Sequence, residues 1–245
     1  MNAMLLGAGR GTRLGSLGLH VPKVLVDIAG EPLLARQLRY LEREGVKRVV
    51  INAHHLSAAI ETFAGEYKGG LDLVVVVEAE LLGTAGGVRN AREFLGDDLV
   101  IVLYGDVLTR QPLRPIVDFH REKGFAATLT IYESDYVEGK GTVAVCDDGS
   151  VTAFAEKETR RGGGSAWINA GLYVLSPGLI DLIPGDGPSD FGHDTFPSAL
   201  EAGKRIGGYR LAEPVIDVGT PEGLAEARRM TAAEAADANP RPPSR

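Results

Sequence analysis

The chain has 245 residues, a formal net charge of −7, a hydrophobic content of 44% and one cysteine. Such a chain can bury one sizeable core without stabilising metals, and a single cysteine excludes an internal disulfide. It lacks the lysine and arginine runs of nucleic-acid binders and the long apolar runs of membrane spans or signal peptides. We therefore expect a soluble, cytoplasmic protein without nucleic-acid or membrane partners, and the composition leaves a homo-oligomer open.

Apolar runs and helical segments alternate in the first half of the chain. The runs predict β-strands at 3–6, 24–28, 48–52, 71–77 and 97–106. The spacing of apolar residues predicts helices at 31–44 and 56–65, and a further helix after LGTAGG at 82–87. Because the strand runs are continuous rather than alternating, they are typical of strands covered on both faces, and this half is predicted to form a parallel α/β sheet.

The second half is richer in strands than in helices. Strand patterns occupy 126–132, 141–157 and 166–175. The turn DDGS inside the second of these predicts a hairpin, so we expect an antiparallel or mixed extension that folds over the parallel sheet. Thr220 and Pro221 are typical of the N-cap and first position of a final helix. Residues 1–230 are predicted to form the domain, and residues 231–245 a disordered tail rich in alanine and proline.

A glycine-rich loop follows the first predicted strand. Gly7, Gly9 and Gly11 in LLGAGRGTRLG allow backbone N–H groups to approach an anion closely, and Arg13 adds guanidinium donors suited to phosphate oxygens. Gly7 and Gly9 also match the first two glycines of a dinucleotide-binding fingerprint, with Asp27 about 20 residues further on. A purely structural turn is the remaining interpretation of the loop alone.

The dinucleotide interpretation fails at two places. Thr12 stands at the third glycine position, and Gly15, Gly18 and Pro22 interrupt the segment that should form a continuous helix. A P-loop is excluded because no Gly-Lys-Ser/Thr follows the glycines. The loop therefore favours a phosphate ligand of another kind.

The stretch LGAGRGTRLGSLGLHVPKVLVDIAGEPLL at 6–34 resembles the signature of the sugar-1-phosphate nucleotidyltransferases, Leu-Ala-Gly-Gly-x-Gly-Thr-Arg-Leu, a spacer and Pro-Lys-Pro-Leu. Gly7 and Ala8 replace Ala-Gly, and Val24 stands where the second proline is usual, but Arg13 and Lys23 are present. Later family motifs are resembled in the same order by EAELLGTAGG (78–87), LYGDVL (103–108), FAEK (154–157), INAGLYVL (168–175) and IDVGTPEGLAEA (216–227). The resemblance covers about residues 3 to 230.

This resemblance implies a three-layer, Rossmann-like α/β nucleotidyltransferase fold with a mixed, mostly parallel central sheet and a smaller antiparallel sugar-binding extension. It also implies an enzyme that transfers a nucleotidyl group from a nucleoside triphosphate to a sugar 1-phosphate, releases pyrophosphate and uses Mg²⁺. The catalytic residues would be Arg13 at the triphosphate, Lys23 near the α-phosphate and Asp106, with Asp106 and Asp217 as the metal ligands.

The resemblance implies the substrate-binding residues as well. Those for the nucleotide are Leu6, Gly7, Gly9, Gly11, Thr12, Arg13, Lys23, Glu78, Gly83 and Thr84. Those for the sugar phosphate are Gly141, Glu156, Lys157 and Asn169. Judged singly, Asp106 fits a turn, Asp217 fits an acid at a helix N-terminus and Lys157 fits a solvated strand end.

Glu78 carries the prediction of the nucleobase. It stands five residues before Gly83, at the family position that reads the base edge. A carboxylate there can accept hydrogen bonds from guanine N1–H and N2–H₂, whereas uracil and thymine offer one N3–H between two carbonyls, so GTP is favoured. A solvated loop acid is the alternative for Glu78.

The acceptor is predicted to be a mannose- or heptose-like sugar 1-phosphate, because VVINAHHLSAAIE, LGTAGG and DFGHDTFP resemble mannose-1-phosphate and heptose-1-phosphate guanylyltransferases. DFGHDTFPSAL at 190–200 is expected to form a loop at a helix start that covers the acceptor site. Three alternatives stay open: a uridylyl-, thymidylyl- or cytidylyltransferase, a non-catalytic regulatory homologue, and an NAD-dependent oxidoreductase.

Overall fold

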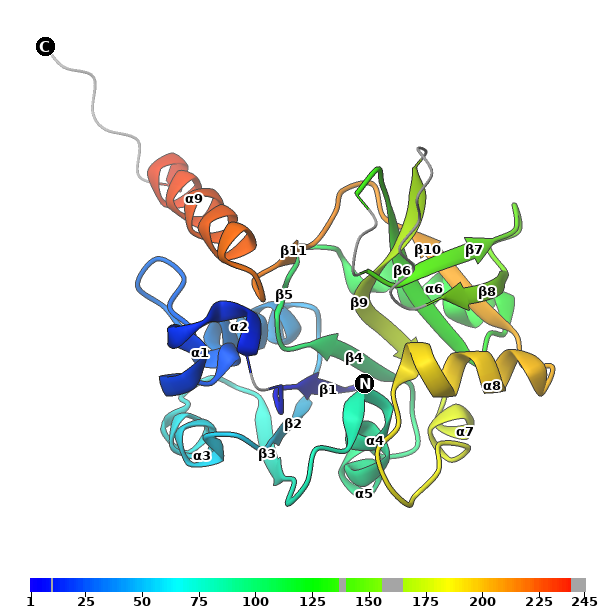
Figure 1. Ribbon diagram of the computed structural model, residues 1–245, viewed down its shortest axis with the longest axis horizontal. Coiled ribbons are helices and arrows are strands. Elements are labelled where there is room, and N and C mark those ends of the chain that lie inside the picture. The colour runs from blue at the N-terminus through cyan, green and yellow to red at the C-terminus, as the bar shows by residue number, and fades with distance from the viewer. Residues whose placement is uncertain (10, 137–139, 156–164, 239–245) are drawn as a thin grey trace, which may run out of the picture.

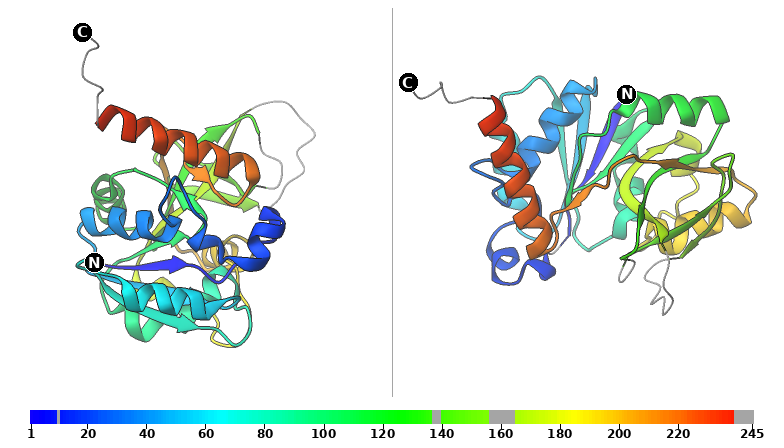
Figure 2. Two further views of the ribbon diagram at one scale, coloured as in Figure 1. Left: turned by 90° about the vertical axis from the view of Figure 1, so that its left-hand side faces the viewer. Right: turned by 90° about the horizontal axis from the view of Figure 1, so that it is seen from above.

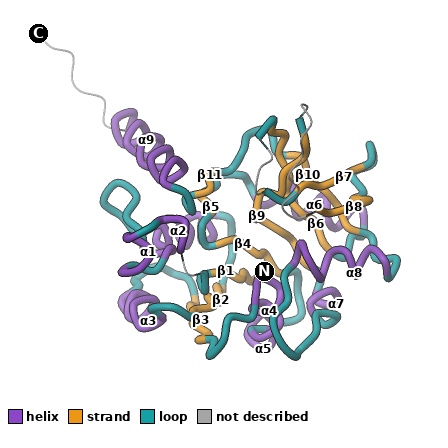
Figure 3. Tube along the Cα trace, viewed as in Figure 1, coloured by secondary structure: helices purple, strands orange, loops and turns teal. Residues whose placement is uncertain are grey.

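The computed structural model describes residues 1–9, 11–136, 140–155 and 165–238. Within them a nine-stranded mixed sheet forms the centre, and helices lie around it (Figures 1 and 3). The strands are β1 (Asn2–Leu6), β2 (Arg48–Ala53), β3 (Asp72–Val77), β4 (Val100–Tyr104), β5 (Val107–Leu108), β6 (Ala127–Ser134), β7 (Thr142–Val145), β8 (Val151–Ala155), β9 (Ala166–Leu175), β10 (Ile206–Arg210) and β11 (Ile216–Asp217).

The α-helices are α1 (Ser16–His20), α2 (Leu33–Arg43), α3 (Ser57–Glu66), α4 (Gly83–Asn90), α5 (Arg92–Leu95), α6 (Leu113–Lys123), α7 (Pro177–Ile180), α8 (Phe196–Glu201) and α9 (Pro221–Ala238). Short 3₁₀ turns cover Thr12–Leu14 and Lys23–Leu25, and a π-helical turn covers Phe191–Thr195. The described residues contain no helix that is long and apolar enough to cross a membrane.

The central sheet is mixed and mostly parallel in its first half, as the sequence predicts. Its strands follow the order β10-β6-β9-β4-β1-β2-β3, with β4, β1, β2 and β3 parallel to one another and β9 antiparallel to both β4 and β6. The hairpin of β7 and β8 joins this sheet through β9, which forms the predicted antiparallel extension. The right-hand view of Figure 2 shows this extension on the far side of the sheet from α9.

Alternate residues of the central strands divide the core into two layers. Met4, Val50 and Val102 pack against α4, α5, α7 and α8 on one face. Leu5 and Ile51 pack against α2, α3 and α6 on the other. Burial on both faces explains why the strand sequences are continuously apolar, and it gives the three layers that the sequence predicts.

A third, smaller core joins the glycine loop to the C-terminal helix. Its members come from the loop, the segment before α2, β11 and α9: Leu14, Val26, Ile28, Leu33, Ile216, Val218, Leu224 and Ala227. The helix begins at Pro221 as predicted, and the Thr220 hydroxyl accepts a hydrogen bond from the Gly223 amide at 3.1 Å. This core fixes the loop, β11 and α9 relative to one another.

The strand predicted at 24–28 is absent from the structure. Lys23–Leu25 forms a 3₁₀ turn, and a tight turn with positive φ at Ala29 and Gly30 follows, closed by a single bridge between Asp27 and Pro32. The apolar side chains of this segment are buried between cores rather than in a sheet, so their hydrophobicity reports burial and not strand pairing.

The predicted boundary at residue 230 falls inside α9, which continues to Ala238. Alanine and glutamate in TAAEAADA favour helix, and Thr231 is buried against the domain, so the start of the predicted tail extends the helix instead. Residues 239–245 of that predicted tail lie outside the described part of the chain.

Candidate active site

Two adjoining cavities lie at the carboxyl ends of the parallel strands. The first, of about 300 Å³, is lined by the loop after β1, by Asn52 near the end of β2, by Glu78 after β3 and by residues that begin α4. The second, of about 230 Å³, lies over the antiparallel extension and includes Gly141 and Asn169. Tyr104 and Asp106 line both, so the end of β4 separates them. Ligands of open α/β sheets bind at this edge.

Four charged side chains gather at the boundary of the cavities. Lys23 forms an ion pair with Asp106, and the Lys23 side chain is only 12% exposed. The Arg13 guanidinium contacts Asp106 at 3.4 Å and Asp217 at 3.1 Å. Two cations and two carboxylates therefore share one small volume, although they come from three distant parts of the sequence.

The short ribbon of β5 and β11 brings the two carboxylates together. Asp217 pairs with Val107 across this antiparallel ribbon, and the Val218 amide donates to the Asp106 carbonyl at 2.8 Å. The Gly219 amide donates to the Asp217 carboxylate, also at 2.8 Å, which fixes the direction of that side chain. The backbone pairing of the ribbon thus places Asp106 and Asp217 next to each other.

Gly219 leaves room for this cluster. A Cβ at this position would lie 2.7 Å from Asp217 Oδ1 and 2.8 Å from Arg13 Nη2, and it would also contact Lys23 Nζ. A larger residue would make these charged groups shift, so the glycine allows their present close approach.

Asp106 and Asp217 are the two carboxylates that the sequence predicts as ligands of a divalent cation. In the structure one guanidinium, that of Arg13, contacts both of them. Mg²⁺ suits this donor set, because it takes one or two protein carboxylates and completes its shell with water and phosphate oxygens. The described residues contain no group of three or more His, Cys, Asp or Glu side chains that could hold a metal ion.

The glycine loop lines the first cavity through Leu6, Gly7, Ala8 and Gly9. The Gly7 amide, expected from the sequence to be free for phosphate, donates instead to the Asn52 side chain at 2.8 Å. Gly11 and Thr12 line neither cavity, and Arg13 lines the second one. The loop therefore offers fewer amides to the first cavity than its glycines suggest.

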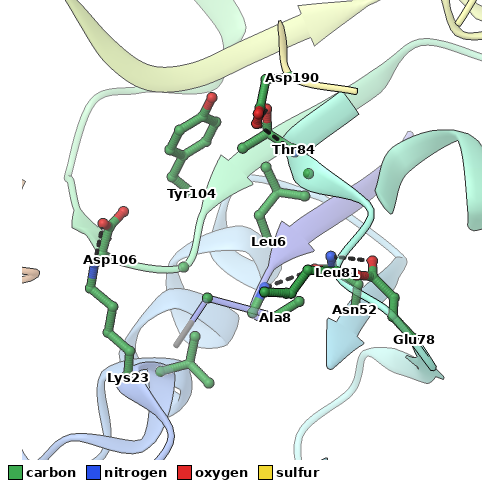
Figure 4. Close-up of a pocket in the computed structure, with 15 residues that line it drawn as sticks. Leu6, Ala8, Lys23, Asn52, Glu78, Leu81, Thr84, Tyr104, Asp106 and Asp190 are labelled. Atoms are coloured by element: carbon green, nitrogen blue, oxygen red, sulfur yellow. Dashed lines mark hydrogen bonds and ion pairs between the residues drawn. The ribbon is translucent and has the colours of Figure 1, made fainter. Parts of the chain in front are cut away.

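Glu78 and Asn52 form a buried hydrogen-bonded pair at the far end of the first cavity (Figure 4). Asn52 Nδ2 donates to Glu78 Oε1 at 2.7 Å, and the Leu82 amide donates to Glu78 Oε2 at 3.2 Å. Glu78 is only 4% exposed, so the solvated loop acid considered from the sequence is wrong.

Thr84 and Asp190 close the opposite wall of the first cavity, where the close-up places them near Tyr104 (Figure 4). The Thr84 amide and hydroxyl both donate to Asp190 Oδ1 at 3.0 Å. Residues 190–200 were expected to cover the acceptor site, but Asp190, the first of them, lines the first cavity instead. Its amide and His193 hold the pKa of Asp194 below its usual range.

The second cavity holds a cation that the sequence did not single out. Lys140 Nζ donates to the Tyr132 hydroxyl at 3.0 Å and lies 5.4 Å from the ring centroids of Tyr132 and Tyr136. Asn169 lines the same cavity and donates to the Tyr173 hydroxyl at 2.6 Å. Polar donors and acceptors thus cover several sides of this space.

Most residues predicted for the site lie in one of the cavities. Leu6, Gly7, Gly9, Lys23, Glu78, Gly83, Thr84 and Asp106 line the first, and Arg13, Asp106, Gly141, Asn169 and Asp217 line the second. Glu156 and Lys157 lie outside the described residues. Asn52, Tyr104, Lys140 and Asp190 were not predicted as ligand-binding residues. Tyr104 is the last residue of an apolar strand and Asn52 the last but one, and this position is a usable signal.

Comparison with known proteins decides the family. A family model described as nucleotidyl transferase matches residues 2–234. The chain belongs to the nucleotidyl transferase family. The resemblance found in the sequence is therefore confirmed, and the NAD-dependent oxidoreductase alternative is not supported.

Curated relatives of this nucleotidyl transferase differ in their nucleotide. It is 34% identical over 224 residues to mannose-1-phosphate guanylyltransferase from Mycobacterium tuberculosis, covering 91% of this chain and 62% of the relative. It is 32% identical over 233 residues to UTP–glucose-1-phosphate uridylyltransferase from Synechocystis sp., covering 89% of this chain and 60% of the relative. The chain thus spans about three fifths of the length of these relatives.

Solved structures confirm the fold of this nucleotidyl transferase. HddC from Yersinia pseudotuberculosis, in a complex with GMP-PN, is 27% identical and superposes with a TM-score of 0.80, covering 94% of this chain and 99% of that one. A UDP-glucose pyrophosphorylase complexed with UDP-glucose is 17% identical with a TM-score of 0.81, covering 95% of this chain and 98% of that one, a likeness that bears on fold alone.

Proposed function

We propose that this protein transfers a nucleotidyl group from a nucleoside triphosphate, with GTP favoured, to a mannose- or heptose-like sugar 1-phosphate. The observation that carries the proposal is the arrangement of two cavities that meet at Asp106, with Arg13, Lys23 and Asp217 at the same boundary. Two substrates can then be held with their phosphates facing each other. Family membership supports the reaction class.

In this reaction a phosphate oxygen of the sugar 1-phosphate attacks the α-phosphorus of the triphosphate. A new P–O bond forms as the bond from the α-phosphorus to the β-phosphate oxygen breaks, and pyrophosphate leaves with the electron pair. Both reactants are anions, so repulsion and orientation are the main obstacles. Positioning and charge neutralisation therefore account for most of the catalysis.

Arg13 and Lys23 supply the neutralising charge from the protein. Lys23 lines the first cavity and would reach the α-phosphate region, whereas Arg13 lines the second and offers a fork of donors to phosphate oxygens. Each now contacts a carboxylate, and phosphates would compete for the same donors. Asp106 and Asp217 would hold Mg²⁺, which when bound offsets negative charge on the phosphates.

The preference for GTP is supported by Glu78. Its carboxylate is buried at the end of the first cavity, and each oxygen accepts one hydrogen bond from the protein. An ionised carboxylate has about four acceptor positions, so one on each oxygen remains for guanine N1–H and N2–H₂. The guanylyltransferase relative and the GMP-PN complex of HddC agree with this assignment.

The similarity to a UTP–glucose-1-phosphate uridylyltransferase makes UTP the second candidate for the nucleotide. A matrix of GTP, UTP, TTP, CTP and ATP against mannose, glucose and heptose 1-phosphates, read by pyrophosphate release with Mg²⁺ present, separates the alternatives. We expect release to be fastest with GTP and a mannose- or heptose-like acceptor. Faster release with UTP on glucose 1-phosphate would overturn the GTP assignment, and no release in any well would favour a non-catalytic homologue.

A further inference from the structure

Asn52 links the two parts of the first cavity that are expected to bind opposite ends of a nucleotide. Its Oδ1 accepts from the Gly7 amide at 2.8 Å, and its Nδ2 donates to Glu78 Oε1 at 2.7 Å. The side chain is 2% exposed, so neither bond is exchanged readily with water. One amide group therefore joins the glycine loop to the carboxylate at the far end (Figure 4).

These bonds restrict the rotation of the Glu78 carboxylate. Asn52 holds one oxygen and the Leu82 amide holds the other, so the plane of the carboxylate is fixed at two points. The acceptor positions that remain on the two oxygens therefore have fixed directions. A carboxylate that could rotate would pay an entropy cost to align with two donors, so its preference for a base with two donors would be smaller.

Gly87 on α4 leaves the space in which this pair forms. A Cβ on Gly87 would lie 2.6 Å from Asn52 Nδ2 and 2.8 Å from Glu78 Oε1. The backbone of Gly87 has no positive φ that would require glycine. Close approach to the Asn52–Glu78 hydrogen bond is thus the reason for a glycine at this position.

We propose that Asn52 is a positioning residue for nucleobase selection. It would orient Glu78 so that both carboxylate oxygens accept from guanine, and its bond to Gly7 would keep the glycine loop in register with that orientation. The inference rests on the proposed function, because it takes a guanine nucleotide as the ligand. It assigns to Asn52 no contact with the reacting phosphates.

Binding of GTP and inosine triphosphate tests the proposal without turnover. Inosine triphosphate lacks the 2-amino group and so removes one of the two donors to Glu78. We expect the wild-type protein to bind GTP about tenfold more tightly, as one buried hydrogen bond to a charged group predicts. Calorimetric titration of Asn52→Ala with each nucleotide should show that the ratio of the two dissociation constants falls to about twofold or less. The reason is that Asn52 no longer holds the Glu78 carboxylate in one orientation.

Two further variants separate positioning from general damage. Gly87→Ala disturbs the same hydrogen bond from α4 while both side chains remain, so its GTP to inosine triphosphate ratio should fall in the same direction. Thr130→Val is the control, since it removes another buried hydrogen bond, from Thr130 Oγ1 to the Leu172 carbonyl at 2.9 Å, on a residue of β6 that lines neither cavity. Its ratio should equal that of the wild type, whatever its melting temperature.

The outcomes are distinct. If Asn52→Ala and Gly87→Ala weaken both nucleotides by the same factor, Asn52 has a structural role only and the proposal is wrong. If Asn52→Ala does not fold, Gly87→Ala alone decides. A wild-type protein that does not distinguish GTP from inosine triphosphate overturns this inference and leaves the transferase proposal in place. Absence of pyrophosphate release overturns the transferase proposal, while the binding ratio remains measurable.

Discussion

Asp217 lies opposite Val107 in the β5–β11 ribbon, and this pairing sets the Asp217 carboxylate within reach of the same guanidinium that contacts Asp106. In the sequence Asp106 precedes the strands of the antiparallel extension, whereas Asp217 follows them. Their meeting point is the boundary of the two cavities, where the reacting phosphates would lie. Several expected effects of substitutions follow from this geometry.

Asp106→Asn should lower the rate of pyrophosphate release by about 100-fold or more, because it removes a charge that Lys23 and the expected metal both need. Asp217→Asn should have an effect in the same direction. The measurement is steady-state release at saturating substrates, with circular dichroism to confirm folding. Asp97→Asn provides a matched control, since Asp97 is 93% exposed and pairs only with Arg92 among the described residues. Full activity of Asp106→Asn would remove this residue from the site.

Gly219→Ala should abolish most activity while the protein still folds. The added methyl group would lie 2.7 Å from Asp217 Oδ1 and 2.8 Å from Arg13 Nη2, so the charged groups must move apart. Gly65→Ala is the control in helix α3, where a Cβ meets nothing within 4 Å. That variant should keep its activity and gain about 0.5–1 kcal/mol in the free energy of unfolding, because alanine is the better helix former. Equal activity in both variants would contradict the crowding argument.

Lys140→Met should raise the KM for the sugar 1-phosphate about tenfold and leave the KM for the nucleotide nearly unchanged, because Lys140 lines only the second cavity. Asp190→Asn should do the reverse, since Asp190 holds Thr84 in the wall of the first cavity. Initial rates with each substrate varied in turn measure both constants. A change in the nucleotide KM alone for Lys140→Met would show that the two cavities are assigned the wrong way round.

Acid should destabilise the fold through His120. Burial between α6 and β6, with a smaller contribution from Arg121, lowers the pKa of His120 to about 4. The unfolded value is about 6.5, so between these values the unfolded chain binds more protons than the folded one. The stabilisation is present above pH 6.5 and is lost as the pH falls towards 4, by about 3 kcal/mol at most.

Urea unfolding at pH 7.5, 5.5 and 4.5 measures this loss. His120→Gln keeps hydrogen-bonding capacity toward Thr128 and Ser176 but does not titrate in this range. The variant should start less stable than the wild type, and the difference between them should shrink as the pH falls. Parallel profiles for the two proteins would mean that His120 is not the titrating group.

The layers of the fold could be predicted from the sequence because burial on both faces leaves continuous apolar runs. The same signal misled at 24–28, where Val26 and Ile28 are buried in the third core without strand pairing. Helix α6 could have been found, since Leu113, Ile116 and Val117 follow helical spacing. Strand β10, with its paired glycines in IGGYR, gave no such pattern, and its pairing with β6 is a tertiary effect.

Residues of the candidate site could be predicted where they belong to a sequence motif. They could not be predicted where their role depends on a hydrogen bond to a residue distant in the sequence. Arg13, Lys23 and Asp106 follow from ordered motifs. By contrast, the use of the Gly7 amide by Asn52, or of Thr84 by Asp190 across 106 residues of sequence, depends on contacts that no local pattern encodes. A glycine-rich stretch indicates close backbone approach, but it does not say which atom approaches.

The β5–β11 ribbon contains only two residue pairs, and about 110 residues separate its strands in the chain. The central sheet already holds β4 and β10, so the ribbon orders only the short segments that follow these two strands, but ordering them costs more than two backbone hydrogen bonds return. The pairing must therefore be stabilised cooperatively by the third core, in which Leu224 and Ala227 of α9 pack with Leu14 of the glycine loop. Local unfolding of α9 would release Asp217 while the central sheet stays folded, so the proposed metal site should be among the first parts of the molecule to open.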